Sequence, residues 1–145
     1  MKRCIVLIVL FWAGPALSQV SVEAAWARAT PPNAKLAAGY LAVVNAGAAD
    51  RLVGASSPAA GRVELHVTTR DGQIMRMRQA KALEVPANGR LELRPAGAHL
   101  MFVELRRAFR KGEKVPVTLR FEKAGEVQAE LAVGDPPEHT EAHRH

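Results

Sequence analysis

Two residue types that can bind a soft metal gather in one part of this sequence. Before the last eight residues the only histidines are His66 and His99, and after residue 18 the only methionines are Met75, Met77 and Met101. Alternate side chains of an extended strand share a face, so Met75 and Met77 would point the same way, as would His99 and Met101. Methionines that only fill a core would not collect beside the histidines. The pattern indicates one site built from both residue types.

The chemistry of these donors favours copper in its reduced state. Thioether sulfur is soft, uncharged and unprotonated, and it therefore prefers Cu(I) to harder ions such as Zn²⁺ or Mg²⁺. Neutral imidazole can complete the coordination. Thioethers, unlike thiolates, cannot be lost to disulfide formation in an oxidising compartment. Such a site would hold Cu(I) firmly and still release it to an acceptor with thiolate ligands, which is the chemistry of a carrier.

Two further segments could bind a ligand, and for each of them a plainer interpretation stays open. His139, His143 and His145 lie close together at the end of the sequence. They could capture Cu(II), or they could belong to a tail that only improves solubility. The basic segment 106–114 could attract an acidic partner or a membrane surface, or it could simply be solvated.

Short strands must position the histidines and methionines. Alternating or β-branched runs are separated by turn residues such as Asn45-Ala46-Gly47, Asp71-Gly72 and Lys123-Ala124-Gly125, and no long segment keeps a helical period. Alanine-rich stretches make helix the competing local interpretation, but the flanking prolines and glycines oppose it. The sequence predicts an all-β sandwich or barrel, with strands at residues 20–30, 36–45, 51–56, 63–68, 74–78, 90–94, 99–105, 115–122 and 126–133.

The first residues are typical of an export signal. Lys2 and Arg3 precede an apolar stretch over residues 5–17, and small residues suit cleavage after Ser18. An uncleaved membrane anchor is the alternative, although the stretch is short for crossing a bilayer. Lipid attachment is not favoured, because Cys4 stands before the apolar stretch. We expect a periplasmic protein with a signal peptide at 1–18, a β-sandwich domain at 19–134 and a disordered tail at 135–145.

Composition excludes several functions for the exported chain. Removal of Lys2 and Arg3 leaves 18 basic side chains against 14 acidic ones, a formal charge of +4 that does not demand nucleic acid. No cysteine remains after Cys4, which excludes a disulfide scaffold, a cysteine nucleophile and the thiolate-bound copper of an electron-transfer cupredoxin. No serine lies in a nucleophile elbow, so we predict that the chain is not an enzyme.

The spacing of the donors resembles that of the periplasmic copper chaperones called PCuAC. Ten residues separate His66 from Met77, and twenty-one separate Met77 from His99-Leu100-Met101. The segments AWARATPP at 25–32 and PAGAHLM at 95–101 also resemble that family, over roughly residues 20–133. Many members carry a further methionine just after the first histidine, and this chain does not. Met75 is therefore the only spare thioether, for which core packing and metal contact stay equally open.

The resemblance implies a cupredoxin-like Greek-key β-sandwich that binds one Cu(I) through four ligands, His66, Met77, His99 and Met101. It also implies delivery of copper toward assembly of the copper site of cytochrome c oxidase. The expected partner is a copper-accepting oxidase subunit or a Sco-type thioredoxin-like protein, with no nucleic acid and no stable membrane insertion after signal cleavage. The rival interpretation is a metal-free exported β-sandwich that binds another protein.

Overall fold

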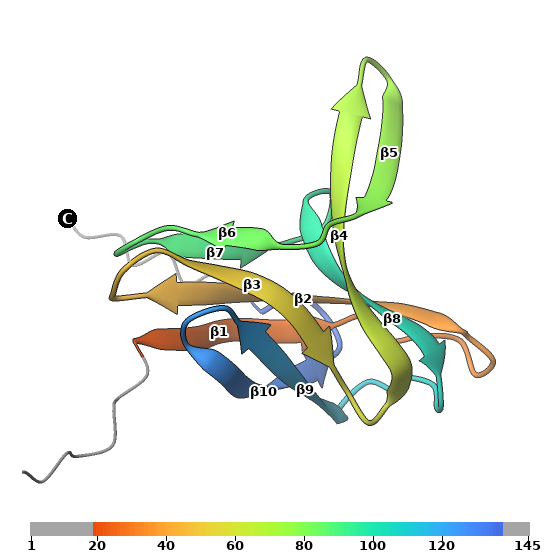
Figure 1. Cartoon of the computed structure of the whole chain (residues 1–145). Helices are drawn as coiled ribbons and strands as arrows, with labels where there is room; N and C mark the ends of the chain where they lie inside the picture. Colours follow the sequence, from red (N-terminus) through yellow and green to blue (C-terminus); the bar gives the residue numbers. More distant parts are fainter. Residues whose placement is uncertain (1–18, 138–145) are drawn as a thin grey trace, which may run out of the picture.

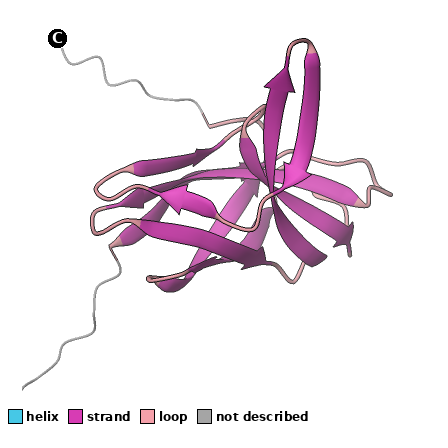
Figure 2. Cartoon of the chain, turned by 45° about the horizontal axis from the view of Figure 1, so that its top comes forward, coloured by secondary structure: helices cyan, strands magenta, loops and turns pink. Residues whose placement is uncertain are grey.

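The computed structural model describes residues 19–137, and the regular elements of this part are all strands (Figure 2). No helix occurs among these residues, so the helical interpretation of the alanine-rich stretches is wrong there. Residues 1–18 and 138–145 lie outside the described residues, and the signal peptide and the domain bounds stay predictions. The strands are β1 (Val20–Ala27), β2 (Leu36–Asn45), β3 (Asp50–Ser56), β4 (Ala60–Asp71), β5 (Ile74–Gln79), β6 (Leu83–Val85), β7 (Arg90–Leu93), β8 (Ala98–Leu105), β9 (Lys114–Phe121) and β10 (Gly125–Val133).

Hydrogen bonding joins the strands into one sheet that closes on itself (Figure 1). The closed part has the order β4-β8-β2-β1-β10-β9-β3, and the pairing of β3 with β4 at Ala55 and Val63 completes a seven-strand barrel. Strands β5 and β6 extend the sheet beyond β4 and β3, and β7 pairs with β2. The pairing of β1 with β10 is parallel. The prediction of an all-β sandwich or barrel is confirmed.

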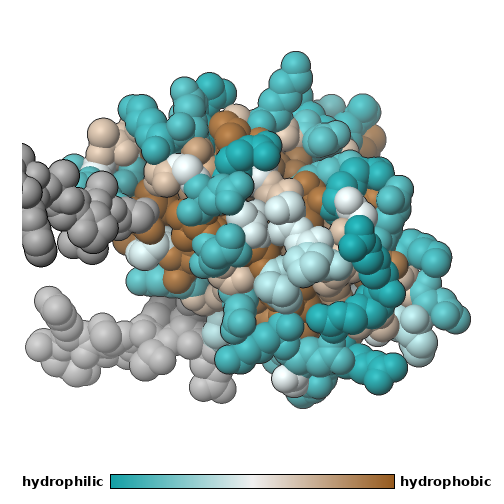
Figure 3. All heavy atoms as spheres, turned by 60° about the horizontal axis from the view of Figure 1, so that its bottom comes forward, coloured by the Kyte–Doolittle hydropathy of each residue, from teal (hydrophilic) through white to brown (hydrophobic). Residues whose placement is uncertain are grey.

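Alternation along the strands fills the interior of the barrel. Strand β9 buries every second side chain, namely Val115, Val117, Leu119 and Phe121, and each such burial contributes about 1.5–3 kcal/mol. Phe102 of β8 packs edge-on against Phe109, with 5.3 Å between the ring centroids. On the face seen in Figure 3, hydrophilic side chains cover much of the surface, with apolar atoms between them. Strand β8 therefore packs one of its faces, which includes Phe102, into the core, and its other face is turned away from the core.

The long strand β4 leaves the barrel halfway along its length. Its first half pairs with β8, and from His66 onward it pairs with β5 in a hairpin that projects from the barrel (Figure 1). The turn lies at Asp71-Gly72, as the sequence predicts, and Gly72 has a φ of 61° that glycine adopts without steric cost. Every side chain of β5 is exposed, including Met75 and Met77. The barrel therefore carries these methionines on an arm beside it.

Apart from shifts in strand bounds, such as β4 at 60–71 instead of 63–68, two details differ from the strands that the sequence predicts. Strand β6 is not predicted, because its three residues are too few to form a recognisable alternating pattern and Pro86 follows them. Strand β1 is irregular, because its pairing with β2 shifts between Glu23 and Trp26 and Ala24 there has a positive φ of 49°. Neither difference moves a proposed ligand.

Asp50 joins the start of β3 to the turn between β9 and β10. Its carboxylate accepts hydrogen bonds from the backbone amides of Arg51, Lys123 and Ala124, at 2.7, 2.8 and 2.9 Å. Burial alone would raise the pKa of this carboxyl, but the three amides outweigh it and hold the pKa of Asp50 below its usual range. The final hairpin, which the sequence predicts, is thus tied to the barrel by a buried charge.

Candidate metal centre

His66 and His99 form the centre of the candidate site. They stand opposite each other on β4 and β8, and their ring centroids are 5.8 Å apart. Their chain neighbours Leu65 and Leu100 are buried in the core, so by alternation both rings lie on the other face of the sheet. An imidazole nitrogen lies about 2 Å from a bound metal, so two rings that share one ion stand roughly 5–6 Å apart. The observed spacing fits a shared metal.

Met101 and Met77 lie on the same face, beside the two histidines. Met101 is two residues after His99 on β8, and therefore points the same way. Met77 on β5 is opposite Thr68, which is two residues after His66 on β4. Residues directly opposite each other on paired strands share a face. The structure therefore brings all four ligands that the sequence predicts to one side of the sheet.

A shallow hollow opens on this side of the sheet. Its lining includes His99, Met77 and Met101, with Met75 also at its wall, whereas His66 is not among the residues that line it. His66 lies next to the ring of His99, which does line the hollow. A second hollow, beside Trp26 and β7, has neither histidine nor methionine in its lining. Of these two hollows, the one lined by His99, Met77 and Met101 has metal-binding chemistry.

Met75 lies at the outer end of the same arrangement. Its side chain is 54% exposed, as is that of Met77. It is opposite Arg70, however, which is two residues farther along the projecting hairpin than Thr68. At a strand rise of about 3.3 Å per residue, this places Met75 about 7 Å beyond Met77. Its position suits an auxiliary thioether better than a member of the central set.

The ring of His99 is held in one orientation. It is 5% exposed, and its Nδ1 lies 3.1 Å from the carbonyl oxygen of Gly97. Because a carbonyl can only accept, Nδ1 carries a hydrogen, and in the neutral ring Nε2 keeps a free lone pair. Tyr40 lies beside the ring at 6.4 Å between centroids, and Trp26 packs on Tyr40 at 4.7 Å. These aromatic rings shield the flank of the site without offering it a ligand.

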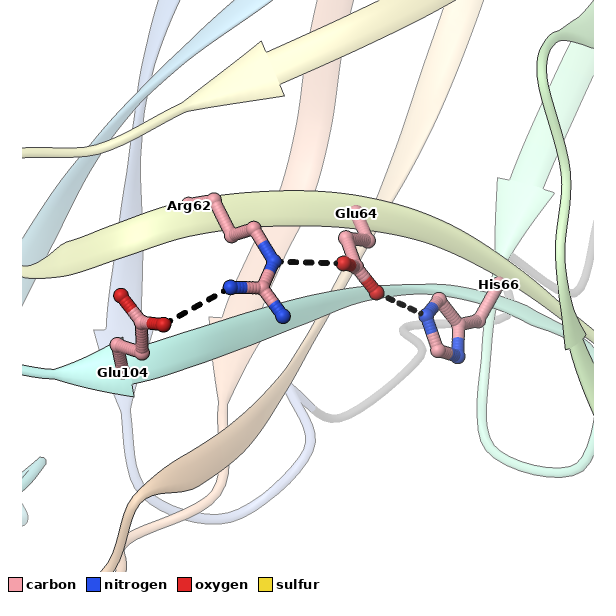
Figure 4. A network of polar contacts seen from close by, with 4 residues as sticks. All are labelled: Arg62, Glu64, His66 and Glu104. Carbon is pink, nitrogen blue, oxygen red and sulfur yellow. Dashed lines mark hydrogen bonds and ion pairs between the residues drawn. The ribbon is translucent and has the colours of Figure 1, made fainter.

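Glu64 is a residue of the site that sequence reasoning missed. Its Oε2 lies 2.8 Å from Nε2 of His66, and its Oε1 accepts a hydrogen bond from Arg62 at 2.8 Å (Figure 4). The hydrogen bond from Arg62, followed by that from His66, holds the pKa of Glu64 below its usual range. Position 64 precedes His66 by two residues in a strand, so the shared face was readable from the alternating pattern.

Groups other than the two histidines and the methionines offer little to a metal. Among residues 19–137, no three His, Cys, Asp or Glu side chains are gathered as a possible metal site. A metal held between His66 and His99 could take further protein ligands from the thioethers on the same face. His139, His143 and His145, the candidate ligands for Cu(II), lie outside the described residues.

The basic segment 106–114 begins at the opposite end of β8 from His99. Arg106 directly follows that strand, so the rise of a strand places it roughly 20 Å from His99. Within the segment, Arg107, Lys111 and Lys114 each form an ion pair with a carboxylate. Arg106 and Arg110 are exposed and take part in none of these ion pairs, so attraction of an acidic partner or a membrane surface stays a prediction.

Solved structures of copper-bound and apo PCuAC domains, and of Cu(I)-bound DR1885, have the same fold. The copper-bound PCuAC domain from PmoF2 matches with a TM-score of 0.70 and 30% identity, over 81% of this chain and 94% of that domain. The apo PCuAC domain from PmoF1 matches with a TM-score of 0.70 and 28% identity, over 81% and 95%. The Cu(I) form of DR1885 from Deinococcus radiodurans matches with a TM-score of 0.62 and 31% identity, over 77% and 75%. The predicted cupredoxin-like fold is confirmed, and the resemblance to PCuAC proteins is supported.

The sequence itself matches a family over nearly all of the described residues. Residues 20–133 fit the family described as "Putative lipoprotein LpqE-like". A protein of Leifsonia xyli subsp. xyli with a lipoprotein description is 36% identical over 103 residues, which are 70% of this chain and 61% of that protein, so the chain spans about three fifths of this curated relative. None of the described residues forms a helix with the length and apolar character to span a membrane. The chain belongs to the LpqE-like family.

Proposed function

We propose that this chain is an exported copper chaperone that binds one Cu(I) through His66, Met77, His99 and Met101 and passes it to an acceptor. One observation carries the proposal: these side chains share a face of the sheet, with the two imidazole rings 5.8 Å apart. The copper-bound PCuAC domain from PmoF2 and the Cu(I) form of DR1885 have the same fold, and this likeness supports copper as the ion.

The proposed ligands suit a carrier better than an enzyme. Two neutral imidazoles and two thioethers bring no charge to the site, and the soft sulfur atoms favour Cu(I). A thiolate is a stronger ligand for Cu(I) than a thioether, so an acceptor with cysteine ligands can take the ion. The exposed side chain of Met77 lies where an incoming protein could replace it first. Carriage needs no change in the oxidation state of the metal.

For the acceptor, we propose a protein that assembles the copper site of cytochrome c oxidase, either the oxidase subunit itself or a Sco-type thioredoxin-like protein. This step rests on the PCuAC spacing of the ligands. Export is supported by the lipoprotein description of the family. We propose the periplasm as the compartment and the segment 1–18 as the signal, because Lys2 and Arg3 precede an apolar stretch that ends in small residues.

Anaerobic titration of residues 19–145 with Cu(I), against a chromophoric chelator, tests the binding. We expect one equivalent of tightly bound Cu(I), with nitrogen and sulfur scatterers both present in X-ray absorption spectra. Incubation of the loaded protein with a purified oxidase copper subunit or Sco-type protein, followed by separation and copper analysis, tests the transfer. Failure to bind Cu(I) would favour the rival function, a metal-free module that binds another protein.

A further inference from the structure

Glu64 contacts the proposed copper site without being one of its ligands. It precedes His66 by two residues on β4, and its Oε2 lies 2.8 Å from Nε2 of that ring. Both side chains are shielded, with 18% of Glu64 and 16% of His66 exposed. Water therefore competes weakly for this hydrogen bond, which can hold the ring in one orientation.

The other oxygen of the Glu64 carboxylate is occupied as well. Arg62 donates from Nε to Oε1 of Glu64 at 2.8 Å and from Nη1 to Glu104 at 2.9 Å (Figure 4). Ion-paired with an arginine, Glu64 is a carboxylate, and a carboxylate can only accept hydrogen bonds. The hydrogen of the contact between Glu64 and His66 must therefore belong to Nε2 of the histidine.

The second nitrogen of the His66 ring has no such partner. Nδ1 is buried and makes no hydrogen bond to any of the described residues. A buried polar atom without a partner is unfavourable, and such atoms in native proteins call for a specific explanation. In a neutral ring with its hydrogen on Nε2, Nδ1 carries the lone pair that a metal ion binds. A metal at the site would supply the missing partner.

The two histidines of the site are therefore oriented in opposite ways. The Gly97 carbonyl accepts from Nδ1 of His99 and leaves Nε2 free, whereas Glu64 accepts from Nε2 of His66 and leaves Nδ1 free. We propose that Glu64 is a positioning residue, which selects the tautomer of His66 so that Cu(I) is bound by Nδ1 of His66 and by Nε2 of His99. The inference rests on the proposed function, because both concern the same metal.

Without Glu64, the neutral ring of His66 would be free to carry its hydrogen on either nitrogen. Molecules with the hydrogen on Nδ1 would present a donor to the metal and could not bind it in this orientation. Loss of a partner that orients a metal-binding histidine commonly lowers metal affinity by about 10- to 100-fold. Removal of Glu64 would release both the tautomer and the orientation of the ring, so a loss in this range should follow.

Long-range ¹H–¹⁵N correlation spectra of the ¹⁵N-labelled protein, residues 19–145, read the tautomers directly. In the metal-free protein, at a pH where the rings are neutral, we expect the hydrogen on Nε2 of His66 and on Nδ1 of His99. On addition of Cu(I) under anaerobic conditions, the shifts of the two opposite nitrogens should change. Since the first spectrum needs no metal, it tests the role of Glu64 separately from copper binding.

Three variants separate positioning from packing. Glu64→Leu removes the acceptor, and should give a mixture of His66 tautomers and a 10- to 100-fold weaker Cu(I) affinity. Glu64→Gln keeps the volume but offers one acceptor oxygen to two donors; with that oxygen on Arg62, its NH₂ group faces Nε2 of His66, so the ring hydrogen should shift to Nδ1 and the Cu(I) affinity should fall as in Glu64→Leu. Glu104→Gln alters the far end of the network, which does not touch His66, and should change neither. Circular dichroism and amide spectra establish that each variant is folded.

The outcomes distinguish this inference from the function on which it rests. If Cu(I) binds through Nε2 of His66, or if Glu64→Leu keeps one tautomer and full affinity, the inference is wrong while the chaperone function stands. If the unaltered protein does not bind Cu(I) at all, both are wrong. A single His66 tautomer that depends on Glu64, together with Nδ1 binding, supports both.

Discussion

His66 lies opposite His99 across the pairing of β4 with β8, with 5.8 Å between the ring centroids. On its other edge β4 pairs with β5, where Thr68 faces Met77. Strand β4 therefore supplies one proposed ligand and is hydrogen-bonded to the two strands that supply the others. Barrel and projecting hairpin meet at this strand, so the histidine pair lies on the barrel and Met77 on the hairpin beside it.

Replacement of Met77 or Met101 by leucine should weaken Cu(I) binding while the fold survives. Leucine keeps nearly the volume of methionine and removes the sulfur, so the free energy of unfolding should change by less than about 1.5 kcal/mol. We expect each variant to lose about tenfold or more in Cu(I) affinity, which corresponds to at least about 1.4 kcal/mol of binding free energy. Competition with a chromophoric chelator measures the affinity, and urea unfolding measures the stability.

Met75→Leu is the matched control for Met77→Leu. The two side chains are equally exposed on the same face of β5, but Met75 lies farther from the histidine pair. Its replacement should therefore change the Cu(I) affinity much less. If Met75→Leu weakens binding as much as Met77→Leu does, the hairpin bends inward and both sulfur atoms take part. If neither replacement has an effect, the proposed ligand set is wrong.

Much of the fold could be predicted from the sequence because its signals are local. The turns at Asp71-Gly72 and Lys123-Ala124-Gly125 and the alternating runs beside them predict two hairpins that the structure contains. The closure of the sheet could not be predicted in this way. It depends on the pairing of Ala55 with Val63, and nothing in either residue identifies the other as its partner.

The candidate site, like the fold, could be predicted from the sequence only where the signal is local. Residue type and alternation predict that His99 and Met101 share a face, and the structure agrees. The role of Glu64 depends on a contact with His66 and on Arg62 behind it. A glutamate in an alternating strand is usually a solvent-facing residue, and only the packing around this one shows that its carboxylate is turned onto the ring.

Asp50→Asn should destabilise the barrel without altering copper binding. The carboxylate accepts three backbone hydrogen bonds, whereas an amide has a single acceptor oxygen and would leave at least one buried N–H without a partner. The expected loss is about 1–3 kcal/mol of the free energy of unfolding, measured by urea denaturation. Asp135→Asn, at the exposed ion pair with Lys111, is the control and should change it by less than about 0.5 kcal/mol. Equal losses in both variants would contradict the special role of Asp50.

Asp50 should also make the free energy of unfolding depend on pH. The pKa of Asp50 in the folded protein is below its usual range, whereas in the unfolded chain it is about 3.9. The contribution of Asp50 is therefore present above about pH 4, and it is lost as the pH falls through the lower, folded value. Thermal unfolding of the unaltered protein between about pH 5 and pH 2 should show a steeper loss than that of Asp50→Asn. Parallel curves for the two proteins would show that Asp50 does not titrate as proposed.

Removal of residues 138–145 should separate the two oxidation states of copper. The deletion removes His139, His143 and His145 but none of the four proposed Cu(I) ligands, so the Cu(I) affinity should stay unchanged. Binding of Cu(II) should fall, because imidazole nitrogen suits Cu(II) better than thioether sulfur does. A full-length variant with glutamine at the three histidine positions is the matched control, since it keeps the length of the chain. If the deletion, the glutamine variant and the unaltered protein bind Cu(II) equally in calorimetric titrations, the C-terminal histidines have no part in capturing copper.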